Sequence, residues 1–120
     1  MSHQSRSVAV VDDDAAVCDS TRFLLEIYGF AVRTYLSGPV FLKDNPDVEC
    51  ILIDYHMPGL NGLELASELR ARGSHVPVIM ITATADAAVE RRAAELGIQR
   101  ILRKPLSNQA LLNAVREELE

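Results

Sequence analysis

Acidic residues follow two short apolar runs of this sequence. The triplet Asp12-Asp13-Asp14 comes directly after Val-Ala-Val-Val, and Asp54 comes directly after Ile-Leu-Ile. Short apolar runs that end in polar and turn residues are typical of buried strands that lead into loops. Parallel sheets gather ligands at the carboxyl ends of their strands, so we expect these acids to share one rim. A simpler alternative is that the triplet only begins a helix, where acids favour the dipole, and we expect Asp14 to do this.

Clustered carboxylates raise one another's pKa unless a cation neutralises them, and carboxylates with water and phosphate oxygens suit Mg2+. A hydroxyl and an amine are expected at the same rim, because Thr82 and Lys104 also follow apolar runs. Lys104 is one of two lysines in an arginine-rich chain, which favours a compact point charge. With Asp54, these groups suit phosphoryl transfer, in which a carboxylate attacks and the hydroxyl and amine hold the phosphoryl oxygens.

Size and composition indicate one globular domain, expected over 1–120. Of its 120 residues, 48% are apolar and 24% are charged. The net charge of -5 argues against direct binding of nucleic acid. No apolar run approaches the roughly 18 residues of a membrane helix, and the polar segment 1–6, expected as a tail, lacks the apolar core of a signal peptide. We expect a cytoplasmic protein without a membrane partner, in which Cys18 and Cys50 are buried, reduced thiols.

Apolar strands and amphipathic helices are expected to alternate five times. The expected strands cover 7–11, 30–35, 50–53, 78–81 and 99–103, with the second nearer an edge. The expected helices run from the cap Asp14 to Gly29, over 37–43, from Asn61 or Gly62 to Gly73, from the cap Asp86 to Leu96, and from the cap Ser107 to Leu119. The predicted fold class is α/β: a doubly wound five-stranded parallel sheet of order 2-1-3-4-5, in a flavodoxin-like three-layer sandwich with five helices.

Four segments of the sequence, in this order, carry a resemblance to a known family. They are Val-Val-Asp12-Asp13-Asp14, Leu-Ile-Asp54-Tyr-His-Met-Pro-Gly, Met-Ile-Thr82-Ala and Arg-Lys104-Pro-Leu. Together they resemble the receiver domain of bacterial two-component response regulators, over nearly the whole chain. The resemblance implies that Asp54 accepts a phosphoryl group from a sensor histidine kinase or a histidine phosphotransfer protein. It also implies a regulatory domain that phosphorylates and dephosphorylates itself, not an enzyme that turns over an external substrate.

The resemblance assigns roles to further residues. Mg2+, for which Mn2+ could substitute, is expected to be bound by Asp13, Asp54 and the backbone carbonyl of His56, with Asp12 acting through water. Thr82 and Lys104 take the roles of phosphoryl-binding and switch residues, and the peptide bond between Lys104 and Pro105 is expected to be cis.

Several predicted roles lie outside this central set. His56 and Thr84 occupy positions that tune hydrolysis of the acyl phosphate in the family, although a solvent-facing loop histidine is an equal alternative for His56. The aromatic switch residue of the family is replaced by Ile101, and we do not transfer the aromatic's role to it.

A candidate interface on the fourth helix and fifth strand, suited to a homodimer or an effector, comprises Arg91, Arg92, Arg100 and Arg103. The segment around the fifth strand resembles receivers that control a helix-turn-helix output, so either a free-standing regulator or part of a transcription factor is possible.

Two other classes of protein compete with this interpretation. A magnesium-dependent phosphatase with a nucleophile at Asp12 fits the Asp-x-Asp pattern, but such enzymes need a cap or longer core that 120 residues hardly supply. An unphosphorylated interaction module on the same fold is the second alternative. The complete set of acids, hydroxyl and amine argues against that module, because degenerate members tend to lose one of these groups.

Overall fold

Strands and helices alternate strictly in the computed structural model of the chain, which describes residues 6–84, 86–98 and 100–119. Asp54 and Thr82, each predicted to follow a strand, are instead the last residues of their strands. Residues 1–5 of the predicted tail and Gln99, the predicted start of the fifth strand, lie outside the described residues. The strands are β1 (Ser7–Val11), β2 (Ala31–Tyr35), β3 (Cys50–Asp54), β4 (Val78–Thr82) and β5 (Arg100–Arg103). The helices are α1 (Ala15–Ile27), α2 (Gly38–Asp44), α3 (Gly62–Ala71), α4 (Ala87–Glu95) and α5 (Asn108–Leu119).

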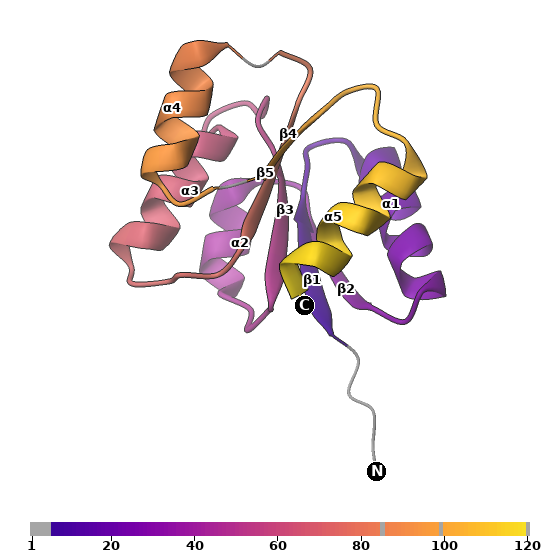
Figure 1. The fold of residues 1–120 in the computed structure, drawn as a ribbon. Helices are drawn as coiled ribbons and strands as arrows, with labels where there is room; N and C mark the ends of the chain where they lie inside the picture. The colour runs from indigo at the N-terminus through magenta and orange to yellow at the C-terminus, as the bar shows by residue number, and fades with distance from the viewer. Residues whose placement is uncertain (1–5, 85, 99, 120) are drawn as a thin grey trace.

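The five strands form one parallel sheet in the order β2-β1-β3-β4-β5, which confirms the predicted fold class. The register places Val11 of β1 beside Ile53 of β3, and Asp54 of β3 beside Ile81 of β4. Because the strands are parallel, their carboxyl ends form a single rim, and the residues that follow β1 lie next to the end of β3. Helices α1 and α5 cover one face of the sheet and α2, α3 and α4 cover the other (Figure 1). As predicted, β2 is an edge strand.

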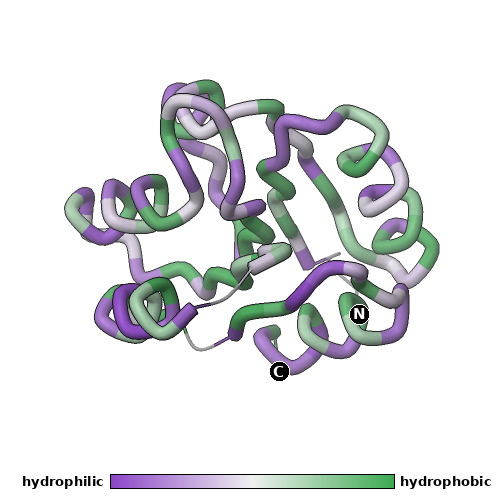
Figure 2. The backbone as a smooth tube through the Cα atoms, turned by 90° about the horizontal axis from the view of Figure 1, so that it is seen from above, coloured by the Kyte–Doolittle hydropathy of each residue, from purple (hydrophilic) through white to green (hydrophobic). Residues whose placement is uncertain are grey.

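The sheet separates two hydrophobic cores. One contains Phe41 of α2, Leu65 of α3 and Ala93 of α4, and the other contains Leu25 of α1 and Leu112 of α5. All five residues of β3 are buried, since both faces of a central parallel strand are covered by helices. Figure 2 shows this arrangement from above: the strands in the middle are mainly hydrophobic, while the helices carry both hydrophilic and hydrophobic residues.

Side chains at the rim fix where the helices begin. Asp14 accepts hydrogen bonds from the first turn of α1, Asp86 accepts one from the Val89 amide at 2.9 Å, and Ser107 accepts one from the Ala110 amide at 3.0 Å. These contacts confirm the three predicted caps. Each N-cap oxygen satisfies a backbone amide that the helix itself cannot pair, so the short loops that carry the rim residues are held at one end.

Three smaller predictions concern the backbone, the cysteines and membrane spans. The Lys104-Pro105 peptide bond is cis, as predicted. Cys18 and Cys50 are buried free cysteines, which confirms the expected thiols. Burial raises the pKa of Cys18 to about 11 and that of Cys50 to about 12, so both thiols are protonated at neutral pH. No helix in the described part of the chain combines the length and apolarity required to cross a bilayer.

Candidate functional site

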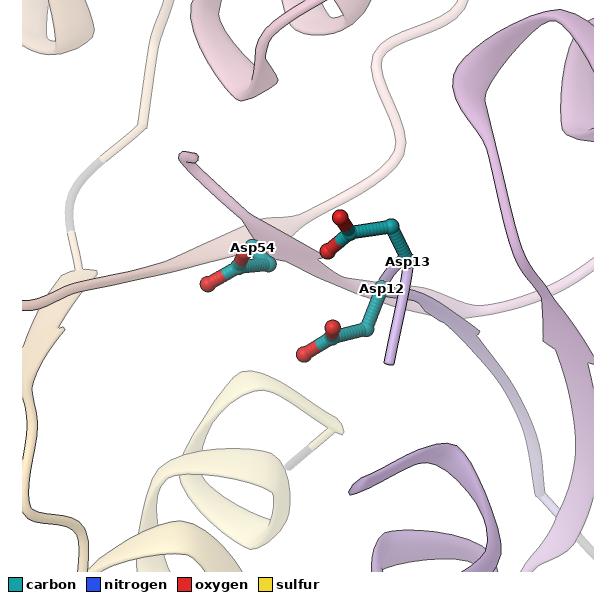
Figure 3. Close-up of side chains that lie close together, drawn as sticks. All are labelled: Asp12, Asp13 and Asp54. Carbon is teal, nitrogen blue, oxygen red and sulfur yellow. The ribbon is translucent and has the colours of Figure 1, made fainter. Parts of the chain in front are cut away.

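Three carboxylates meet where β1 and β3 end. Asp12 and Asp13 follow the last residue of β1, Asp54 ends the neighbouring β3, and each offers an oxygen within 4.8 Å of the others. Figure 3 shows the three side chains lying close together at this rim. Asp12 is only 5% exposed and Asp54 only 4% exposed, whereas Asp13 is exposed. The structure therefore brings together the acid group that the sequence placed at one rim.

The surroundings of Asp12 disfavour its charged form. Burial of the carboxyl raises the pKa of Asp12 above its ordinary value, and the charges of Asp54 and Asp13 add to the increase. The Asp14 amide donates to Asp12 Oδ1 at 2.9 Å and, together with the Lys104 ammonium, acts in the opposite direction without reversing it. A divalent cation between the acids would relieve the same repulsion.

Lys104 reaches the acid group from the loop after β5. Its Nζ lies 2.8 Å from Asp54 Oδ1, so the two side chains form an ion pair. The Lys104 side chain is 40% exposed. Contact with the Asp54 carboxylate is the largest cause that raises the pKa of the Lys104 ammonium, while burial opposes it. Within the described residues, Asp54 Oδ1 accepts no hydrogen bond of favourable angle, so the attraction is chiefly that of opposite charges at short range.

The Thr82 hydroxyl lies at the same rim but is engaged elsewhere. Thr82 is fully buried at the end of β4. Its hydroxyl donates to the backbone carbonyl of Thr84 and accepts from the Thr84 amide at 3.1 Å. Both bonds tie the hydroxyl to the β4–α4 loop. A contact between this hydroxyl and a group on Asp54 would therefore require the hydroxyl to leave Thr84.

His56 and Thr84, predicted to flank the acceptor, contact each other. His56 Nε2 lies 3.4 Å from Thr84 Oγ1, and the His56 ring meets the Tyr55 ring edge-on with centroids 4.7 Å apart. His56 is exposed, and the contact joins the β3–α3 loop to the β4–α4 loop. The structure thus brings the two predicted flanking residues into contact across two loops at the carboxyl end of the sheet.

Gly62 is a site residue that the sequence analysis identified only as a helix start. A Cβ added to Gly62 would lie 2.6 Å from Met80 Sδ and 2.9 Å from the Tyr55 Cα. The Gly62 amide also donates to the Tyr55 carbonyl at 3.0 Å. Only glycine therefore allows α3 to begin against the end of β3. The glycine is visible in the sequence, but the close contacts with Met80 and Tyr55 that require it appear only in the folded chain.

Ile101 and the four arginines lie away from the acid group. Ile101 is half-buried and packs against the core beneath α2, α3 and α4. Arg92 pairs with Glu95 at 3.1 Å, and Arg100 pairs with Glu117 at 2.8 Å. Arg91 and Arg103 are exposed on α4 and at the end of β5. Arg92 and Arg100, both predicted interface residues, are thus already paired within the chain.

The donor set fits a hard divalent cation. Three carboxylates from two adjacent strand ends converge, two of them are buried, and one buried Asp54 oxygen lacks a directional hydrogen bond within the described residues. Mg2+ prefers oxygen ligands and a small number of carboxylates, with its remaining positions filled by water or phosphate oxygens. The charge of such an ion would offset the repulsion among the three acids.

Comparisons with known proteins agree with this geometry. A model of the response regulator receiver domain matches residues 8–116. The chain is 42% identical over 118 residues to the transcriptional regulatory protein FixJ of Azorhizobium caulinodans, a match that covers 97% of this chain and 56% of FixJ. The chain belongs to the receiver domain family of response regulators, whose members are regulatory and bind Mg2+ at an acidic pocket.

Solved structures show the same fold. A response regulator receiver protein from Burkholderia phymatum is 39% identical, with a TM-score of 0.82 over 96% of this chain and 95% of that chain. A CheY-like receiver domain protein from Methanospirillum hungatei is 26% identical, with a TM-score of 0.91 over 97% of this chain and 94% of that chain. The chain spans about half the length of the curated relatives it matches, several of which are transcriptional regulatory proteins.

Proposed function

We propose that this domain is the phosphoacceptor of a two-component phosphorelay, with Asp54 as the accepting residue. The observation that carries the proposal is the setting of Asp54: a buried carboxylate at a strand end, 2.8 Å from Lys104 and flanked by Asp12 and Asp13. A buried carboxylate with an adjacent cation and further acids is suited to bind a phosphoryl group and a metal together.

In the proposed reaction, an Asp54 oxygen forms a bond to phosphorus while the phosphorus–nitrogen bond of a donor phosphohistidine breaks. The donor imidazole keeps the electron pair of that bond, and Asp54 becomes an acyl phosphate. The Lys104 ammonium holds one phosphoryl oxygen by charge, and the Thr82 hydroxyl, released from Thr84, donates to another. The donor would be a sensor histidine kinase or a histidine phosphotransfer protein.

Asp13 and Asp54, the His56 backbone carbonyl and Asp12 through water are the proposed ligands for Mg2+. When bound, the ion neutralises charge that develops on the phosphoryl oxygens. His56 and Thr84, which contact each other across the β3–α3 and β4–α4 loops, are proposed to control the access of water to the acyl phosphate. The protein side of the reaction is therefore positioning and charge compensation.

The proposed consequence of phosphorylation is a change at the face formed by α4 and β5. Movement of the Thr82 hydroxyl would break both of its bonds to Thr84, in the loop that leads directly into α4. We propose that the altered face, with Arg91 and Arg103 exposed on it, controls an output such as transcription, through a homodimer or an effector. The receiver unit would extend over 1–120.

Acetyl phosphate and Mg2+ provide the direct test. We expect the wild-type protein to gain one phosphoryl group by intact mass, and Asp54→Asn, which keeps the shape of the side chain, to gain none. Asp47→Asn, which replaces an exposed acid outside the site, is the matched control and should react like the wild type. Equal phosphorylation of Asp54→Asn would refute the proposed acceptor. A wild-type protein that binds Mg2+ but gains no phosphoryl group would favour an unphosphorylated interaction module.

A further inference from the structure

Helix α4 is buried at one end only. Ala93 is its single buried residue, and the next buried residues, Leu96 and Ile98, follow its last turn. Before Ala93, every α4 residue is exposed except the half-buried Val89. Helices in globular proteins derive most of their stability from the packing of an apolar face. The carboxyl-terminal end of α4 is therefore anchored, while its first two turns have almost no buried surface.

Arg70 strengthens this anchor from the neighbouring helix. Its Nε donates to the Leu96 carbonyl at 2.7 Å, and its Nη1 donates to the Val76 carbonyl at 2.9 Å and to the Ser74 carbonyl at 3.2 Å. The half-buried guanidinium thus joins the end of α3, the α3–β4 loop and the end of α4. Figure 1 shows α3 and α4 next to each other in the same helical layer.

Carbonyl groups, not carboxylates, hold the Arg70 charge. Among the described residues, Arg70 makes no ion pair, and burial lowers the pKa of its guanidinium. The last carbonyls of a helix carry partial negative charge and lack partners within the helix, so a cation placed there is favourable. The planar fork of arginine can reach several carbonyls at once, which the single ammonium of lysine does less well.

The opposite end of α4 connects to the candidate site. Asp86 caps the helix through the Val89 amide at 2.9 Å, and Thr84, two residues earlier, holds the Thr82 hydroxyl through its backbone. A change at Thr82 would therefore act on the end of the helix that packing restrains least. The end held by Arg70 lies on the far side of Ala93 and, among the described residues, forms no hydrogen bond with Thr82.

We propose that Arg70 is the pivot of α4: it fixes the carboxyl-terminal end of the helix to the α3–β4 loop, so that a change at Thr82 swings only the amino-terminal end. This inference rests on the proposed phosphorylation of Asp54 and assigns its regulation to a residue outside the acid group. Arg70 acts as a positioning residue, since it contacts neither Asp54 nor Thr82. The movement along α4 is graded, from the first turn to the fixed last turn.

Amide hydrogen exchange measured without a phosphodonor tests the anchor by itself. Arg70→Met retains the length of the side chain but removes its donors, and we expect the amides of Leu96, Gly97 and Ile98 to exchange at least about tenfold faster than in the wild type. Arg70→Lys should restore part of the protection. The matched control is Arg72→Met, because Arg72 lies at the same helix end but pairs with Glu68 at 3.1 Å. Unchanged exchange in Arg70→Met would overturn the proposal.

The same measurement with acetyl phosphate and Mg2+ tests the pivot. In wild-type protein shown by mass to be phosphorylated, exchange should change in the first half of α4 and stay constant at 96–98. In Arg70→Met the change should extend to 96–98, and in Arg72→Met it should not. A uniform change along wild-type α4 would overturn the pivot. Failure of the wild type to gain a phosphoryl group would refute the proposed function and the switching role, while the exchange without phosphodonor still decides whether Arg70 is the anchor.

Discussion

The two halves of the rim differ in how firmly they are held. At the ends of β1 and β3, Asp12 and Asp54 are buried, the Asp14 amide is bonded to Asp12, and Gly62 brings α3 directly against the end of β3. At the ends of β4 and β5, the Thr82 hydroxyl is turned toward its own loop. The β5 residues are half-buried or exposed, and α4 has one buried residue.

This difference indicates that the two halves of the rim have different roles: one binds and the other responds. In the half that carries the acids, burial, the bond from the Asp14 amide and the close approach at Gly62 hold the carboxylates in place despite their repulsion. The half that carries Thr82 has polar contacts that can be exchanged for others at little cost in buried surface. A binding half that is fixed and a responding half that is loosely packed would allow a small charge change at Asp54 to alter a distant face.

The largest expected effect is on metal binding in the fixed half. Asp13→Asn removes one carboxylate charge from the proposed ligand set and should lower Mg2+ affinity about 100-fold, or about 2.7 kcal/mol. Asp14→Asn is the matched control, since asparagine is also a good N-cap and Asp14 caps α1. Calorimetric titration with MgCl2 measures both variants. Equal affinities for Asp13→Asn and the wild type would place the ion elsewhere.

A second prediction concerns the packing that holds the fixed half. Gly62→Ala places a methyl group 2.6 Å from Met80 Sδ and 2.9 Å from the Tyr55 Cα, so α3 must move away from the end of β3. We expect a loss of about 2 kcal/mol in the free energy of unfolding by urea denaturation, and weaker Mg2+ binding as the Asp54 loop shifts. Gly59→Ala has open space and only an unfavourable φ of 80°, so its loss should be smaller. Equal losses would show that close approach at Gly62 is unimportant.

The sequence predicted the fixed half well because its signals are local. Apolar runs that end in Asp12 or Asp54, the cap at Asp14, and the alternation of elements each depend on neighbouring residues. The order of the strands followed from the rules for parallel sheets. Since the acids end adjacent strands, their meeting in space required no knowledge of side-chain packing.

The features that the sequence did not reveal depend on contacts between distant segments or on the orientation of a side chain. Arg70 has the pattern of an ordinary solvated helix residue, and only the folded chain places it against Leu96. The two hydrogen bonds between the Thr82 hydroxyl and the Thr84 backbone depend on how the Thr82 side chain is oriented, which residue type does not decide. The partner of Arg100 was likewise hidden, because Glu117 is 17 residues beyond Arg100 in the chain, whereas Arg92 pairs with a local helix neighbour, Glu95.

The smallest expected effect on stability is at the point where the two halves meet, the ion pair of Lys104 with Asp54. In the unphosphorylated protein the pair is partly exposed, so Lys104→Met should cost no more than about 1 kcal/mol in the free energy of unfolding at pH 7. The folded-state pKa of Lys104 is raised above 10.5, so this contribution is fully present below pH 10.5 and is lost as the pH rises through the raised value.

Urea denaturation of wild type and Lys104→Met from pH 7 to pH 11.5 checks the sign, because their difference should shrink only at the alkaline end. Lys43→Met, which removes the other lysine, is the control: Lys43 forms no ion pair within the described residues, and its removal should change stability by less than about 0.5 kcal/mol throughout.

Lys104→Met should still bind Mg2+, because the three acids remain. After treatment with acetyl phosphate, however, hydrogen exchange of its α4 amides should change less than in the wild type. A full wild-type response in Lys104→Met would mean that the fixed half alone transmits the phosphoryl charge, and that Lys104 does not connect the two halves.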